Sequence, residues 1–160
     1  MATKVLLVED SKFLRLANER ILVKAGFLVS TAADGEEALT AASEKLPDII
    51  LLDMMLPKIS GPDVLKKLKA NPLTSSIPVI VLTSLSQINA DKLMSEGAAA
   101  YFEKSSLALD KGPDLLAATV EKVFSQVSQQ KSVDLRTRNL RTRELAAKKS
   151  AGQVNPEPTC

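Results

Sequence analysis

The chain contains no histidine and no tryptophan, and its single cysteine is the last residue, Cys160. Without histidine, the chain cannot form His-based zinc sites or Ser-His and Cys-His nucleophile pairs, and it cannot carry a phosphohistidine itself. One cysteine cannot form an internal disulfide, so the fold does not depend on an oxidising compartment. Any chemistry must therefore use carboxylates, hydroxyls, lysine, backbone groups or a bound metal.

Long hydrophobic runs are also missing. The longest, residues 49–52 and 78–82, are far too short to cross a bilayer, and the opening MATKVLLVED does not resemble a signal peptide. With 160 residues, 45% of them hydrophobic and 25% charged, the composition is that of one soluble globular domain with room for a short extension. We expect a cytoplasmic protein with no membrane insertion.

Short β-type runs alternate with longer segments of helical period. The predicted strands are 4–8, 27–32, 48–53, 78–82 and 98–102. Between and after them, the predicted helices run from about residue 12 to Gly26, over 35–45, from Ser60-Gly61-Pro62 to Asn71-Pro72, over 87–96 and from about Pro113 onward. Five strand-helix units predict an α/β fold with a parallel sheet and helices on both faces.

Polar residues follow four of the predicted strands. These residues are Glu9 and Asp10, Asp53, Thr83 and Ser84, and Lys104. In a parallel sheet they would share one edge, where ligands of such folds bind. Crowded carboxylates repel each other unless a hard, oxygen-preferring cation lies among them, and Mg²⁺ fits that description. With a lysine and a hydroxyl nearby, the open anionic position suits a phosphoryl group.

This set of residues resembles the receiver domain of a two-component response regulator. The likeness is carried by Glu9-Asp10, by Asp53 in LLDMMLP, by Gly61, by Thr83-Ser84, and by Tyr101 three residues before Lys104, and it covers about residues 3–129. The family has a flavodoxin-like, doubly wound, five-stranded parallel sheet of order 2-1-3-4-5. We therefore expect a receiver domain over 1–129 and a basic extension over 130–160.

The resemblance implies that Asp53 accepts a phosphoryl group from a phosphohistidine on a sensor histidine kinase or phosphotransfer protein. The family further implies that Asp10, Asp53 and the backbone carbonyl of Met55 bind Mg²⁺ directly, while Glu9 acts through water. Lys104 and Thr83 would contact the phosphoryl oxygens. Thr83 and Tyr101 would be the switch residues. The expected output is a changed protein-binding face on helix four, strand five and helix five. The chain would act as a switch, catalysing only its own phosphoryl transfer and slow autodephosphorylation.

Plainer interpretations exist for single residues. Asp53 could cap a loop, Glu9 and Asp10 could cap the first helix, and Tyr101 could be ordinary strand packing. The chain also departs from the family where Ser105 follows Lys104, because the family usually has a proline with a cis peptide bond there. The resemblance also implies that the residues two past Asp53 and Thr83 border the path of the hydrolytic water. Here these are Met55 and Leu85, which are apolar and cannot orient water, so we predict slow hydrolysis of the phosphoryl group.

The last thirty residues differ in charge from the rest. Residues 131–160 hold seven basic and three acidic residues, a net of +4, whereas residues 1–130 carry a net of −2. Residues 132–149 are good helix formers without an apolar seam, and QVNPEPTC has the composition of a disordered end. A solvated extension or partner-docking arm is favoured over salt-sensitive nucleic-acid binding, because aromatics and a recognition motif are missing.

The main alternative is the receiver portion of a DNA-binding or larger multidomain effector. A haloacid-dehalogenase-type phosphatase is set aside, because that class needs a second aspartate at the position of Met55. A flavin-binding electron carrier is disfavoured, because the first strand leads into acidic residues instead of a phosphate-binding Ser/Thr/Gly loop. The sequence leaves open the cognate kinase, the target and homodimer formation.

Overall fold

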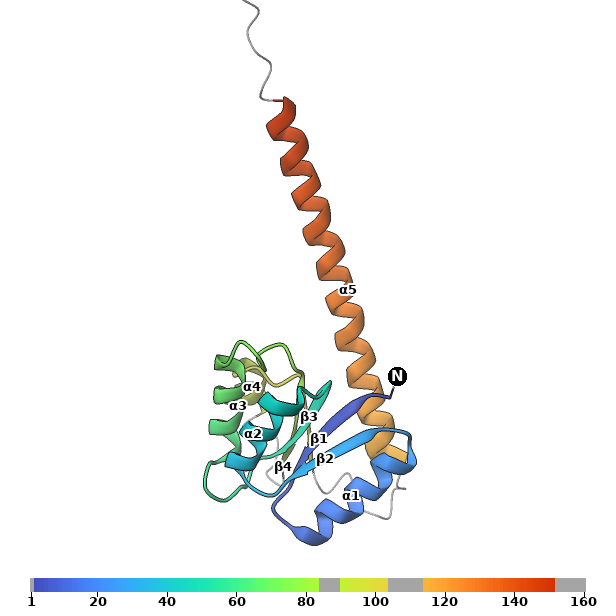
Figure 1. Cartoon of the computed structure of the whole chain (residues 1–160), viewed down its shortest axis with the longest axis vertical. Coiled ribbons are helices and arrows are strands. Elements are labelled where there is room, and N and C mark those ends of the chain that lie inside the picture. Colours follow the sequence, from blue (N-terminus) through green and yellow to red (C-terminus); the bar gives the residue numbers. More distant parts are fainter. Residues whose placement is uncertain (1, 84–89, 104–113, 152–160) are drawn as a thin grey trace, which may run out of the picture. The chain divides into compact units, whose positions relative to one another are not determined.

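The computed structural model describes residues 2–83, 90–103 and 114–151. Strands and helices alternate along the chain (Figure 1). The elements are β1 (Lys4–Val8), α1 (Lys12–Lys24), β2 (Leu28–Ala32), α2 (Gly35–Lys45), β3 (Ile49–Asp53), α3 (Gly61–Ala70), β4 (Val79–Thr83), α4 (Ala90–Ser95), β5 (Ala100–Glu103) and α5 (Asp114–Ala151).

All strand pairs are parallel, and the strands lie in the order β2-β1-β3-β4-β5. Figure 1 shows α2, α3 and α4 on one side of the sheet and α1 with the first turns of α5 on the other. The predicted flavodoxin-like, doubly wound fold of order 2-1-3-4-5 is therefore confirmed.

Alternate residues of the central strands point to opposite faces. Leu6, Ile50 and Leu52 belong to a buried cluster that also holds apolar residues of α2, α3 and α4, while every residue of β3 is buried. Burial on both faces explains why β3 reads as a continuous aliphatic run instead of an alternating one.

Side chains at the helix starts satisfy backbone donors. Ser11 Oγ accepts from the Leu14 N–H at the start of α1, Asp34 Oδ1 from the Glu37 N–H in α2, and Ser60 Oγ from the Asp63 N–H in α3. These caps fix where each helix begins, directly after a strand or loop at the same edge of the sheet.

The ends of β2, β3 and β4 lie within one residue of the sequence predictions, whereas β5 starts at Ala100 instead of residue 98. Helix α4 runs from Ala90 to Ser95, and its predicted start at residue 87 lies outside the described residues. The later start of β5 follows from the turn at Gly97, which has φ 110°, and from the Ala98 N–H donating to Leu93 O at 3.1 Å, which closes α4. Helix α5 is one element from Asp114 to Ala151, and compact units span residues 1–124 and 125–160. The expected domain border at residue 129 stays a prediction.

Candidate phosphoacceptor and metal site

The carboxyl ends of four strands meet at one edge of the sheet. Val8 pairs with Leu52, Asp53 with Leu82, and Thr83 with Glu103. Glu9 and Asp10 directly follow β1, while Asp53 and Thr83 are the last residues of β3 and β4. The sequence prediction that these polar side chains share an edge is therefore confirmed for the described members.

Three carboxylates gather there. Glu9, Asp10 and Asp53 each offer one carboxylate oxygen, and these oxygens all lie within 4.8 Å of one another. Glu9 and Asp53 are almost fully buried, with 1% and 2% of their surface exposed, whereas Asp10 is exposed. The cluster thus has a closed inner side and an open side at Asp10.

Backbone contacts hold the acidic pair after β1. The Glu9 N–H donates to Ala32 O at 3.0 Å, and the Ser11 N–H donates to Glu9 Oε1 at 3.3 Å. The guanidinium of Arg15 donates to the carbonyl oxygens of Glu9 and Asp10 at 3.0 and 3.4 Å. These bonds anchor the backbone of both residues and the side chain of Glu9, so the position of the acidic pair after β1 is fixed.

The loop after Asp53 folds tightly around that residue. The Met55 N–H donates to Asp53 Oδ1 at 3.1 Å, and the Met54 N–H donates to Leu82 O at 3.1 Å. At the end of the loop, the Gly61 N–H donates to Met54 O at 3.1 Å. A Cβ on Gly61 would lie 2.5 Å from Met54 Cα and 2.6 Å from Asp53 O, so only glycine allows this approach.

An ion-pair group fastens the same loop to α2. Lys58 Nζ lies 3.4 Å from Asp34 Oδ2 and 3.6 Å from Glu36 Oε2. The hydrogen bond from the Glu37 N–H and, secondarily, the charge of Lys58 lower the pKa of the Asp34 carboxyl. Attraction to Asp34 raises the pKa of Lys58 in turn.

The donor set fits a small hard cation. Carboxylate oxygens are the ligands that Mg²⁺ prefers, and at metal-oxygen distances of about 2.1 Å its ligands lie at most about 4.2 Å apart. Oxygens within 4.8 Å of one another are close enough for one cation to be reached by all three carboxylates, directly or through water. The acidic pocket is therefore suited to Mg²⁺, and the cation would relieve the repulsion between the three carboxylates.

The remaining predicted residues have different surroundings. Thr83 is buried, and Tyr101 is half-buried and packs against the core cluster on the side of α2, α3 and α4. Met55 has 65% of its surface exposed. Lys104 and Leu85 lie outside the described residues, as do Ser84 and the Lys104–Ser105 peptide bond.

Sequence reasoning missed Arg15 and Lys58. Arg15 lies one turn after the acidic pair, on a capped helix, and that spacing was an available signal. The sequence contained no signal for the role of Lys58. Its ion pair with Asp34 depends on a left-handed backbone conformation with φ 66°, which lysine does not favour.

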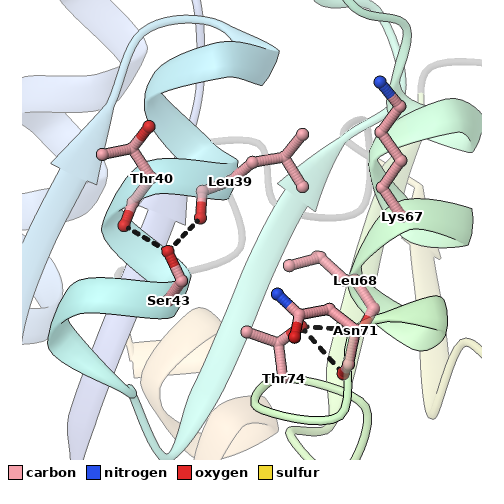
Figure 2. A pocket seen from close by; sticks show the side chains of 7 residues that line it. All are labelled: Leu39, Thr40, Ser43, Lys67, Leu68, Asn71 and Thr74. Carbon is pink, nitrogen blue, oxygen red and sulfur yellow. Dashed lines mark hydrogen bonds between the residues drawn. The ribbon is translucent and has the colours of Figure 1, made fainter.

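A hollow of about 310 Å³ lies between α2 and α3, away from the carboxylates (Figure 2). Its lining residues come from the later turns of both helices and the turn after α3: Leu39, Thr40, Ser43, Lys67, Leu68, Asn71 and Thr74. Ser43 Oγ donates to Leu39 O and Thr40 O, and Thr74 Oγ1 donates to Leu68 O at 2.7 Å. These hydroxyl protons are used in fastening the backbone, which favours a structural role for the hollow.

Several solved structures share this architecture. The chemotaxis response regulator CheY4 of Vibrio cholerae is 30% identical, with a TM-score of 0.67 over 77% of this chain and 99% of that chain. The receiver domain of the Francisella response regulator 1452 is 26% identical, with a TM-score of 0.69 over 78% of this chain and 98% of that chain.

Relatives are also found by sequence. The gliding motility regulatory protein of Myxococcus xanthus is 39% identical over 122 residues, 75% of this chain and 15% of that protein. Response regulator PleD of Caulobacter vibrioides is 44% identical over 85 residues, 53% of this chain and 19% of that protein. The chain thus spans only a minor part of these two relatives.

Among the helices in the described part of the chain, none combines the length and apolar character that a membrane span requires. A family model for the response regulator receiver domain matches residues 5–112, about two thirds of the chain. Together with the sheet order and the clustered carboxylates, this match means that the chain belongs to the response regulator receiver family.

Proposed function

We propose that the chain is a phosphoacceptor switch in which Asp53 receives a phosphoryl group. The observation that carries the proposal is the Asp53 carboxylate at the end of β3, with oxygens of Glu9 and Asp10 within 4.8 Å. A buried carboxylate among other carboxylates costs free energy, so its retention calls for a use.

The donor is a phosphohistidine of another protein, because this chain has no histidine. An Asp53 carboxylate oxygen attacks the phosphorus, the phosphorus–nitrogen bond breaks, and the electron pair leaves with the imidazole. The product is an acyl phosphate on Asp53. The hydrogen bond from the Met55 N–H to Oδ1 orients the carboxylate, which supports attack through Oδ2.

Asp10, Asp53 and the backbone carbonyl of Met55 would hold Mg²⁺ directly, and Glu9 would act through water. When bound, the ion neutralises charge on the phosphoryl oxygens. The fixed backbone of Glu9 and Asp10 and the closed loop from Met54 to Gly61 preorganise the chain's own oxygens for this task.

Signalling follows from residues at the neighbouring strand ends. Thr83 donates its hydroxyl to the phosphoryl group, Lys104 pairs with another of its oxygens, and Tyr101 changes rotamer against the core cluster. These movements shift the population of the face formed by α4, β5 and α5. The chain is then a switch and not an enzyme acting on other molecules, and it hydrolyses its own phosphoryl group slowly.

The partners are a sensor histidine kinase or phosphotransfer protein and a downstream protein, within the cytoplasm. We assign residues 1–129 to the receiver and 130–160 to an extension. A second candidate is the receiver portion of a larger effector. It is favoured by the lengths of two relatives, since the chain spans 15% of the Myxococcus xanthus gliding motility regulatory protein and 19% of PleD.

Intact mass spectrometry after incubation with acetyl phosphate, with and without Mg²⁺, tests the proposal. We expect one added phosphoryl group in the wild type with Mg²⁺ and none in Asp53→Asn. Asp48→Asn is the matched control, because Asp48 lies just before the opposite end of β3, where its Oδ2 accepts from the Lys4 N–H at 2.8 Å. An adduct that persists in Asp53→Asn, or no adduct in the wild type, would overturn the assignment.

A further inference from the structure

One stretch of α5 carries an unusual density of arginine. Residues 135–138 and 140–143 both read Leu-Arg-Thr-Arg, so nine residues hold four arginines and no acid. All nine are exposed and lie within one continuous helix, drawn from orange to red in Figure 1. We call Leu135 to Arg143 the arginine segment.

The arginines lie on two opposite sides of the helix. At about 100° per residue, Arg136 and Arg143 are about 20° apart, and Arg138 and Arg141 are about 60° apart. The directions of these two pairs differ by about 180°. The segment therefore presents two cationic sides instead of one basic stripe.

The segment has no apolar side. Leu135 and Leu140 have 58% and 60% of their surface exposed. They point about 140° apart on the helix, too far to form a common seam. A membrane surface or a helical groove requires a continuous apolar stripe, so neither is a suitable partner.

We propose that the arginine segment binds the phosphate backbone of duplex DNA by lying in the major groove. That groove is about 12 Å wide and admits an α-helix, with one phosphate row on each side. A partner with negative charge on both sides of the helix matches two opposed arginine pairs, whereas a flat acidic protein surface contacts only one side. Duplex RNA has a deep and narrow major groove that side chains enter poorly.

The chemistry of the segment supports phosphate as the ligand. All four cations are arginine, whose planar fork can donate two parallel hydrogen bonds to phosphate oxygens. Thr142 Oγ1 donates to Arg138 O at 2.9 Å, so that hydroxyl proton serves the helix. Residues 1–130 carry a net charge of −2 and would repel DNA, whereas residues 131–160 carry a net charge of +4 and would attract it. Binding is independent of base sequence, because phosphate contacts carry no sequence information directly.

The test is fluorescence anisotropy of a labelled DNA duplex titrated with the full-length protein at several NaCl concentrations. Four phosphate contacts predict a slope of log affinity against log salt of about −3.6, which weakens binding about 150-fold between 50 and 200 mM. Arg136→Ala/Arg143→Ala and Arg138→Ala/Arg141→Ala should each reduce the slope by about 1.8, and the fourfold variant should remove binding. Alanine keeps the helix, which circular dichroism verifies.

The matched control, Arg20→Ala/Lys24→Ala, removes two exposed cations from α1 and should bind as the wild type does. A wild type that fails to bind at 50 mM NaCl, or a fourfold variant that still binds, would overturn the proposal. If one arginine pair alone accounts for the whole salt slope, the contact is one-sided and the proposal is wrong. Equal affinity for DNA and for duplex RNA or polyglutamate would also overturn it. Asp53→Asn should leave DNA binding unchanged, so this test is separate from that of the phosphoacceptor.

Discussion

Lys58 Nζ lies 3.4 Å from Asp34 Oδ2, and this ion pair joins the loop after Asp53 to the N-cap of α2. The contact is reinforced at the next residue, because a Cβ on Gly35 would lie 2.6 Å from both Cβ and O of Ile59. The loop that is proposed to hold the metal thus rests on a helix start that is itself capped by Asp34.

The stability of wild-type protein relative to Asp34→Asn should depend on pH. The asparagine keeps an oxygen for the Glu37 N–H but loses the charge that faces Lys58. Because folding lowers the pKa of Asp34 below its ordinary value of 3.8, its ionised form stabilises the fold above that value. This stability is lost as the pH falls through the lowered folded pKa.

Urea unfolding at a series of pH values from 7 to 3 measures the effect. Asp34→Asn should be less stable than wild type at pH 7, and the gap should close at acid pH. In the background of Lys58→Gln the gap should shrink but persist, since the Glu37 N–H donates to a charged oxygen in Asp34 and to a neutral one in the asparagine. A gap that stays constant with pH would contradict this account.

Gly61→Ala should impair both stability and phosphorylation. Its Cβ meets backbone atoms of Asp53 and Met54 at 2.5 to 2.7 Å, so the loop itself must shift. We expect a loss of about 1–3 kcal/mol in the free energy of unfolding. Displacement of the Met55 carbonyl should also slow phosphorylation by acetyl phosphate.

Gly26→Ala is the matched control for that variant. Gly26 has φ 99°, but nothing lies within 4 Å of its added Cβ, so the substitution costs about 1–2 kcal/mol of backbone strain only. Urea unfolding and the rate of mass gain should separate the two glycines. Equal phosphorylation rates in both variants would show that the loop position does not matter.

Asp10→Asn should weaken the dependence of phosphorylation on Mg²⁺. Losing an exposed carboxylate ligand should raise the half-saturating Mg²⁺ concentration at least about tenfold, since even partners of metal ligands contribute 10–100-fold. Glu9→Gln should raise it less, because a water-mediated contact survives as a hydrogen bond. A titration of phosphorylation rate with MgCl₂ gives the order, and the reverse order would refute the ligand assignment.

The phosphoryl group on Asp53 should be long-lived compared with that of a fast chemotaxis-type regulator. Met55 is exposed beside the acceptor and its apolar side chain cannot orient water. Met55→Gln should therefore shorten the lifetime severalfold, measured by mass spectrometry after removal of the phosphodonor. Met94→Gln, an exposed methionine in α4, should leave it unchanged. A short wild-type lifetime, or no effect of Met55→Gln, would count against the role of Met55.

The sheet was predictable because its signals are local and mutually consistent. The run from Ile49 to Leu52 predicted a strand buried on both faces, and all five residues of β3 are buried. The start of β5 was misplaced because Ala98 has strand-like neighbours, yet its N–H closes α4. The sequence pattern does not indicate whether the Ala98 N–H donates within the sheet or to the end of α4.

The carboxylates were predictable because parallel strands align their ends, which brings Glu9, Asp10 and Asp53 together without further information. The roles of Arg15 and Lys58 depend on side-chain reach and on one left-handed backbone position, which residue type does not encode. The two-sided arrangement of the arginines likewise required a continuous helix, because helical phase is lost wherever a helix breaks.

Strand β3 has hydrogen-bonded neighbours on both sides, β1 and β4, and the proposed acceptor, Asp53, is its last residue. A strand in that position cannot slip without breaking two ladders at once, and its amides exchange with solvent only when the whole sheet opens. Under the proposed function, a phosphoryl group on Asp53 would be attached to a strand that neighbours hold on both sides, and local opening of that strand would not release it. The lifetime of the group would then depend on hydrolysis at Asp53.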